Sequence, residues 1–161
     1  MRIQSFLFYL LLPTLCFSQN LELRKRIDSN VSTIKSNPSK TSSFTKAERI
    51  NGQETAVHYS FKLINGQLNH IAREYSNKDS SVRQHFYSSN SKLVYSTESI
   101  TNYYGKDSIG WGGSYWFEYG KLKDYETLGH GKSESETWEP EIEVLNNYQK
   151  ARLAVRTYLK K

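Results

Sequence analysis

The stretch YSFKLINGQL, residues 59–68, decides how this chain of 161 residues folds. Side chains alternate in character on both sides of Asn65-Gly66, a dipeptide typical of two-residue hairpin turns. With this turn, Leu63 lies opposite Leu68 and Phe61 opposite His70. One face then holds Val57, Tyr59, Phe61, Leu63, Leu68 and Ala72, and the other holds His58, Ser60, Lys62, Asn69 and Arg73. Such a division predicts an antiparallel sheet with one buried and one solvated face.

Two degenerate copies of the hairpin follow, QHFYSSNSKL at residues 84–93 and YWFEYGKL at residues 115–122. Each has aromatic residues, a turn centred on Asn or Gly, and a Leu two positions beyond the turn. The same register pairs Arg83 with Glu98 and Glu118 with Lys121, and such opposite charges across strands are mildly stabilising. Copies about one hairpin apart predict an up-and-down meander of about seven strands.

The pattern aromatic-x-Phe-x-x-Asn-Gly-x-Leu resembles the hairpin unit of MORN-like repeat proteins, including toxin–antitoxin components. The resemblance covers about half of residues 19–161. The copies are unevenly spaced, the second lacks its Gly, and flanking helices are not part of that pattern. It implies a meander of hairpins and carries no catalytic residue over to this chain.

Helical patterns flank the strands. Apolar residues three and four apart predict a helix over residues 21–36, which Asn37-Pro38 ends because the residue before proline avoids the helical region. A second helix begins at Pro140, with acidic residues in its first turn and basic residues near its end. We therefore expect an α+β fold, an antiparallel β-meander covered on one face by the N- and C-terminal helices. Glycines in residues 102–114 predict a long bent loop between two strands.

Residues 1–18 read as a signal peptide. Met1-Arg2 is followed by an apolar run at residues 6–12 and by the small-x-small pattern Cys16-Phe17-Ser18. We expect cleavage near Ser18-Gln19, a secreted or periplasmic protein, and a single domain over residues 19–161. The alternative, a lipoprotein acylated at Cys16, is disfavoured because Leu15 is not small. The run is too short to span a bilayer, which needs about 20 apolar residues, so no transmembrane segment is expected after cleavage.

Composition excludes several kinds of chemistry. Removal of residues 1–18 leaves 21 basic and 16 acidic residues and no cysteine. Disulfides and thiol catalysis are therefore excluded after cleavage, and no run of like charges signals nucleic-acid binding. The sequence lacks a nucleophile elbow, a phosphate loop and the histidine spacings of zinc sites. We expect no metal, no cofactor and a non-enzymatic role.

The solvated sheet face and the Gly/Trp-rich loop are the candidate ligand site. Aromatic rings stack on sugars, and interleaved cations attract anions, although aromatics on exposed strands also simply pack against Lys and Arg stems. The candidate ligand-binding residues are Trp111, Trp116, Tyr87, His85, Arg73, Arg83 and Lys62. The prediction is an exported binding module of a bacterial-type cell envelope that contacts a protein or a polysaccharide. The alternatives are an inhibitor or immunity-type protein that blocks a toxin or enzyme, and a hydrolase of unknown substrate.

Overall fold

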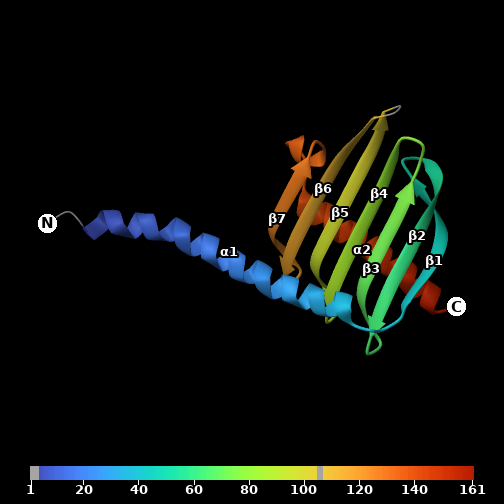
Figure 1. Cartoon of the computed structure of the whole chain (residues 1–161), viewed down its shortest axis with the longest axis horizontal. Coiled ribbons are helices and arrows are strands. Elements are labelled where there is room, and N and C mark those ends of the chain that lie inside the picture. The colour runs from blue at the N-terminus through green and yellow to red at the C-terminus, as the bar shows by residue number, and fades with distance from the viewer. Residues whose placement is uncertain (1–3, 105–106) are drawn as a thin grey trace.

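A computed structural model describes residues 4–104 and 107–161, and the side chains of residues 20–103 and 107–161. Seven antiparallel strands form one open sheet in which each strand pairs with the next along the chain (Figure 1). The elements are α1 (Gln4–Ser36), β1 (Thr41–Ile50), β2 (Gln53–Ile64), β3 (Gln67–Ser76), β4 (Ser80–Ser89), β5 (Lys92–Tyr104), β6 (Asp107–Glu118), β7 (Lys121–Gly129), the short 3₁₀ helix η1 (Lys132–Glu134) and α2 (Pro140–Leu159). The α+β class and the seven-strand meander are confirmed.

Two-residue turns with positive φ at both positions join four of the strand pairs. Asn65 and Gly66 have φ of 51° and 75°, as the Asn-Gly signal predicts for a turn whose twist matches that of the strands. The degenerate copies make the same turn with less permissive residues, since Ser91 has φ of 63° and Tyr119 has φ of 53°. Hairpin geometry is thus kept where the turn sequence has diverged.

The three repeated hairpins also share a β-bulge directly after their common leucine. In the first, Leu63 pairs with Leu68 but Lys62 pairs with His70, so that Asn69 is an extra residue. The same shift follows Leu93 in β5 and Leu122 in β7. A bulge of one residue moves the rest of the strand to the opposite face.

The bulges correct the predicted register. Phe61 lies opposite Ile71 and not His70. Arg73 therefore lies on the same face of the sheet as Phe61, whereas Ala72 lies on the opposite face. Arg83 lies opposite Ser99 and not Glu98. The pairing of Glu118 with Lys121, which precedes the bulge, is confirmed.

The helices pack on opposite faces of the sheet, which corrects the expectation that both cover one face. We call these the α1 face and the α2 face (Figure 1). The α2 face carries the larger core, in which Phe61, Phe86 and Phe117 pack with Tyr148 and Val155 of α2. The α1 face carries a smaller cluster, formed by Ile27, Val31, Ile34, Tyr87 and Trp116. Both faces of the sheet therefore carry buried apolar residues. The alternation of side chains along a strand does not separate a buried face from a solvated one here.

Polar contacts fasten α1 to its face. The Trp116 indole donates a hydrogen bond to Asp28 at 3.0 Å, and Arg24 Nε lies 2.6 Å from Asp124. Lys62 Nζ donates to the carbonyls of Ile34, Lys35 and Asn37 at 3.3, 3.2 and 2.9 Å. A cation at this position satisfies the last carbonyls of a helix and favours the negative end of its dipole.

The expected loop over residues 102–114 is wrong. β5 continues to Tyr104 and β6 begins at Asp107, so only residues 105–106, outside the described residues, separate the strands. One glycine of β6, Gly113, has a packing role instead. A Cβ on Gly113 would lie 2.4 Å from the Tyr115 hydroxyl oxygen, so that glycine makes room for a fully buried tyrosine.

Candidate functional site

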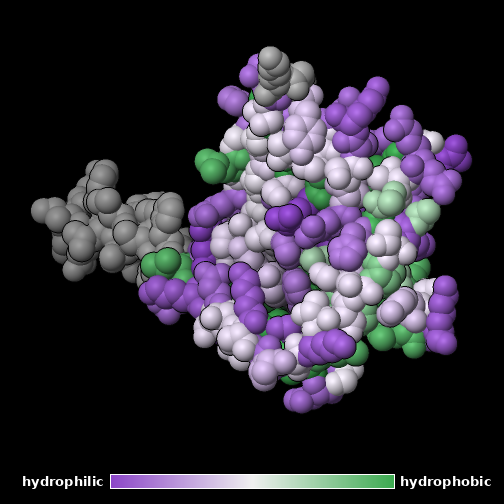
Figure 2. Space-filling view, turned by 45° about the vertical axis from the view of Figure 1, so that its right-hand side comes forward, coloured by the Kyte–Doolittle hydropathy of each residue, from purple (hydrophilic) through white to green (hydrophobic). Residues whose placement is uncertain are grey.

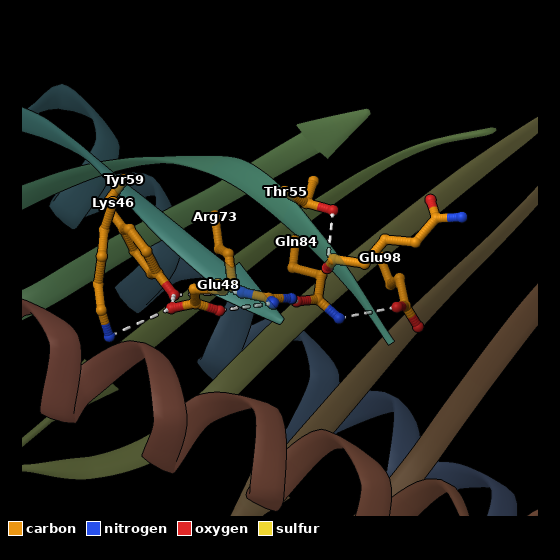
Figure 3. Close-up of polar contacts among 8 residues, drawn as sticks. Lys46, Glu48, Thr55, Tyr59, Arg73, Gln84 and Glu98 are labelled. Carbon is orange, nitrogen blue, oxygen red and sulfur yellow. Dashed lines mark hydrogen bonds and ion pairs between the residues drawn. The ribbon is translucent and has the colours of Figure 1, made fainter. Parts of the chain in front are cut away.

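A row of polar side chains crosses the α2 face, where the fold otherwise buries apolar residues. Tyr59, Arg73, Gln84 and Glu98 occupy neighbouring positions on β2, β3, β4 and β5. Glu48 reaches the row from β1, and we call these five residues the polar row (Figure 3). Arg73, Gln84 and Glu98 are each less than 8 % exposed. Buried ionic groups of this kind are costly unless they are paired and hydrogen-bonded.

Arg73 is the centre of the row and is bonded on three sides. Its Nη2 donates to Glu48 Oε2 at 3.1 Å, its Nη1 to Gln84 Oε1 at 3.0 Å and its Nε to the Tyr59 hydroxyl at 3.3 Å. The Tyr59 hydroxyl in turn donates to Glu48 Oε1 at 2.6 Å. The guanidinium also lies over the Tyr75 ring, 4.7 Å from its centroid. These contacts fix the orientation of Arg73 before any ligand arrives.

The row continues beyond the sheet into the segment that leads to α2. Gln84 Nε2 donates to Glu98 Oε1 at 2.8 Å, and Lys132 Nζ donates to Glu98 Oε2 at 2.9 Å. Lys132 also pairs with Glu143 of α2, whose other oxygen accepts from the Trp138 indole at 2.8 Å. The network therefore connects five strands, η1 and the first turn of α2.

The electrostatics of the row keep Glu48 and Arg73 charged at neutral pH. Burial by itself would raise the pKa of Glu48, but hydrogen bonds from Tyr59 and Arg73 outweigh it and lower that pKa below its usual value. Burial also opposes the charge on Arg73, yet its bonds to Tyr59 and Glu48 raise its pKa. Burial and the adjacent Glu48 raise the pKa of Tyr59, so its hydroxyl stays protonated and donates.

A cleft opens beside the row, between β1, β3 and α2. Its cavity volume is about 650 Å³, within the usual range for small-ligand sites. Arg73 and Glu48 lie on the strand side, and Asn147, Lys150, Leu153 and Thr157 line the helix side, at spacings that place them along one face of α2. Lys46, Arg73 and Lys150 bring three cations to the lining against one carboxylate, that of Glu48. Arg49 also lines the cavity, but its Nε donates to the Gly52 carbonyl at 3.2 Å. We call this cavity the α2 cleft.

Most of the predicted site residues share the α1 face, but they do not form an open surface. Tyr87 and Trp116 are buried beneath α1, at 6 % and 5 % exposure. Lys62 bonds the last carbonyls of α1, and His85 contacts His70. The expectation that these aromatic rings face solvent is wrong because an amphipathic helix covers them.

Among the predicted site residues on the α1 face, Arg83 is the one that is exposed. It pairs with Glu74 at 3.1 Å and lines a depression of about 670 Å³ on the α1 face beyond α1. Its other lining residues include the Ser and Thr side chains of Ser76, Ser81, Ser99 and Thr101. Figure 2 shows that hydrophilic residues, in purple, cover much of the face turned toward the viewer, with smaller hydrophobic patches in green. The charge of Arg83 is already balanced by Glu74, so the depression has less electrostatic character than the α2 cleft.

The remaining predicted residues, Trp111 and Arg73, lie on the α2 face. Trp111 is 3 % exposed and meets the Trp138 ring edge-on, with ring centroids 5.9 Å apart. Trp111 and Trp116 therefore point to opposite sides of β6, and the structure does not bring them together. Arg73 reaches the α2 face because of the bulge at Asn69.

Two histidines form a pair that the sequence reading did not anticipate. His70 Nε2 and His85 Nδ1 lie 3.2 Å apart, and their rings stack with centroids 5.4 Å apart. Burial, the neighbouring His85 and the charges of Lys62 and Lys35 lower the pKa of His70 to about 4. Burial likewise lowers the pKa of His85. Both rings are therefore neutral at neutral pH.

Sequence reasoning missed Glu48, Lys46 and Lys150, which carry most of the charge of the α2 cleft. A signal was present in β1, where Lys46 and Glu48 occupy every second position between Phe44 and Ile50 and so share the inward face with them. Charged residues at inward positions point to a buried ion pair or a site. Lys150 carried no such signal, because it lies on an exposed part of a helix.

Comparisons with protein-family models, with curated proteins and with solved structures find no match to this chain. Among the described residues, His, Cys, Asp and Glu side chains form no group of three or more suited to a metal ion. No helix in the described part of the chain has the length and apolar character needed to cross a membrane. The function is therefore argued from the α2 cleft itself.

Proposed function

We propose that this protein is an exported, non-enzymatic binding module and that its ligand occupies the α2 cleft. The observation that carries the proposal is Arg73, a buried cation whose orientation is fixed on the strand side of a cavity of about 650 Å³. A preorganised polar group in a concave site binds a ligand without the cost of ordering its own side chain.

The charge state of the cleft supports binding over catalysis. The pKa shifts of Glu48, Tyr59 and Arg73 all move away from neutrality, whereas general acid–base catalysis requires a pKa near the working pH. A set of fixed charges suits recognition. Export rests on residues 1–18, whose pattern is that of a signal peptide.

The test is capture from envelope extract with the immobilised protein, followed by identification of the retained material by mass spectrometry. Leu153→Trp introduces bulk at the wall of the α2 cleft, at a residue that is 67 % exposed and tolerates a larger side chain. Leu128→Trp makes the same change at an 83 % exposed residue of β7. We expect retention by the wild type and by Leu128→Trp, and loss of retention by Leu153→Trp.

Equal retention by all three proteins would place the contact outside the α2 cleft. No retention by the wild type would contradict the binding role. Retention of one protein in a tight stoichiometric complex would favour the inhibitor alternative, whereas retention of a mixed set or of polysaccharide favours an envelope-binding module.

A further inference from the structure

We infer that the ligand of the α2 cleft carries an anionic group, a carboxylate or a phosphate, on a small apolar body. The inference rests on the proposed function, because it names the chemistry that the same cleft recognises. Its basis is the distribution of charge and apolar surface around the cavity.

The carboxylate of Glu48 is already fully used by the fold. One oxygen accepts from Tyr59 at 2.6 Å and the other pairs with Arg73 at 3.1 Å. Arg73 and Glu48 thus balance each other within the polar row. Two further cations of the lining, Lys46 and Lys150, therefore leave the cleft with a positive excess, whereas Arg49 donates its Nε–H to the Gly52 carbonyl at 3.2 Å.

Lys46 makes only a distant contact with the ion pair of Arg73 and Glu48. Its Nζ lies 3.7 Å from Glu48 Oε1, beyond hydrogen-bond distance, and its side chain is 55 % exposed. Such a pair is weak in water. The ammonium group can therefore turn toward a ligand with little loss of its contact to Glu48.

The cations come from both walls of the cleft. Lys46 belongs to β1, and Lys150 belongs to α2. An anion between the walls meets positive charge on two sides, and charge-assisted hydrogen bonds to carboxylate or phosphate are stronger than neutral ones. A cationic ligand would meet repulsion from the same groups.

Apolar side chains complete the lining. Ile50 and Tyr75 lie on the strand side, and Leu153 and Ala154 lie on the helix side. The aliphatic side chains offer no hydrogen bond to an inorganic ion, but together with the ring of Tyr75 they can bury the alkyl or ring portion of a ligand away from water. The site therefore favours an amphiphilic anion over inorganic phosphate.

The experiment titrates the purified protein with four probes and follows backbone amide shifts by NMR. The probes are hexanoate, hexyl phosphate, hexanol and hexyltrimethylammonium, with inorganic phosphate as a fifth for comparison. We expect saturable shifts at residues 46–51 and 147–157 for the two alkyl anions, weaker shifts for inorganic phosphate, and none for hexanol or hexyltrimethylammonium. The affinity of the alkyl anions should fall with added salt.

Lys46→Gln and Lys150→Gln should each weaken hexyl phosphate binding by about threefold or more, in line with the loss of a solvent-exposed ion pair. The matched control is Lys121→Gln, which removes the same charge from an exposed position on β7, the strand at the other edge of the sheet, and should leave the affinity unchanged. Equal weakening by Lys121→Gln would mean general attraction by net charge and would overturn the inference.

The source of the anion is distinguished with vesicles. Flotation with phosphatidylglycerol vesicles but not phosphatidylcholine vesicles, lost in Lys150→Gln, would assign a lipid headgroup, whereas hexyl phosphate binding without flotation would assign a soluble anion. Binding of hexanol or hexyltrimethylammonium as tight as that of the anions overturns the inference. If Leu153→Trp still abolishes capture in that case, the proposed function survives and only the ligand chemistry is wrong.

Discussion

His70 Nε2 and His85 Nδ1 lie 3.2 Å apart on neighbouring strands, with the two rings stacked beside Tyr87. At this distance one ring nitrogen donates a hydrogen bond and the other accepts it, so at least one ring must be neutral for a normal bond. The pair lies near Lys35 and Lys62, whose positive charges oppose protonation. Protonation of His70 is therefore disfavoured in the folded protein.

This pair predicts loss of stability in mild acid. The pKa of His70 is about 4 in the folded state and about 6.5 when unfolded. Between these values the unfolded chain binds more protons, so stability is complete above about pH 6.5 and falls as pH drops toward 4. We expect a loss of about 2 kcal/mol from His70 across this range, measured as the shift of the urea unfolding midpoint between pH 7 and pH 4.5.

The comparison with His70→Gln isolates this contribution, since the variant should show a flatter dependence on pH over the same range. His58→Gln, at an exposed histidine, should keep the wild-type dependence. If His70→Gln is as acid-sensitive as the wild type, the stability loss comes from other groups.

Arg73 is expected to matter more for stability than any exposed arginine. Arg73→Met leaves Glu48 partly buried with only Tyr59 and the distant Lys46 as partners, and it should cost about 3 kcal/mol of unfolding free energy. Arg83→Met breaks the exposed pair with Glu74 and should cost less than about 1 kcal/mol. Chemical denaturation at pH 7 measures both.

A double variant tests whether the loss comes from the stranded carboxylate. Arg73→Met with Glu48→Leu removes both charges and should be more stable than Arg73→Met alone. If the double variant loses as much unfolding free energy as the two single variants combined, this account is contradicted. Packing, and not charge, would then explain the effect.

Trp116 should control how tightly α1 is bound to the sheet. Trp116→Phe removes the indole donor to Asp28 and weakens the stacking of Arg24, whose guanidinium lies 4.3 Å from the ring centroid. We expect amide hydrogen exchange in residues 27–34 to accelerate about tenfold, which corresponds to about 1.4 kcal/mol. Exchange in α2 should not change, because α2 packs on the other face.

Tyr119→Phe is the control, because Tyr119 is 82 % exposed in a turn. Equal acceleration in α1 and α2 on substitution of Trp116 would indicate global destabilisation and would count against local release of α1.

Two adjacent glycines of β6 should respond differently to alanine. A Cβ on Gly113 would lie 2.4 Å from the Tyr115 hydroxyl oxygen and 2.8 Å from its Cζ, whereas one on Gly112 meets only the Glu98 carbonyl oxygen at 3.7 Å. Gly113→Ala should therefore cost about 1–3 kcal/mol by overpacking, and Gly112→Ala should change stability by less than about 1 kcal/mol. Thermal unfolding of the two variants provides the measurement, and similar melting temperatures would show that Tyr115 moves aside at little cost.

Local chemistry explains how much of the fold can be predicted from the sequence. Asn51-Gly52 and Asn65-Gly66 specify turns because both positions take positive φ, and the alternation after each turn specifies a strand. The helix ending at Ser36 and the helix beginning at Pro140 follow from apolar spacing and from proline at each boundary. Phe61, Phe86 and Phe117 occupy equivalent positions in the three hairpin copies, and they pack on one face of the sheet.

The candidate site was predicted less well, because its residues depend on details of pairing. The bulge at Asn69 turns Arg73 toward α2 and turns His70 toward α1, and a turn sequence gives no sign of an extra residue several positions later. The chain also gave no sign of how its two amphipathic helices would be divided between the faces, since each has an apolar stripe that suits either one.

The sequence by itself determined the order and kind of the elements, because turns, strands and helices depend on neighbours within a few residues. Only the tertiary structure decided which side chains share a face, because one inserted residue after Leu68 reverses the rest of β3. It also decided that a fixed arginine would lie beside Lys46 and Lys150, residues far apart in the chain that meet only where α2 crosses β1 and β3.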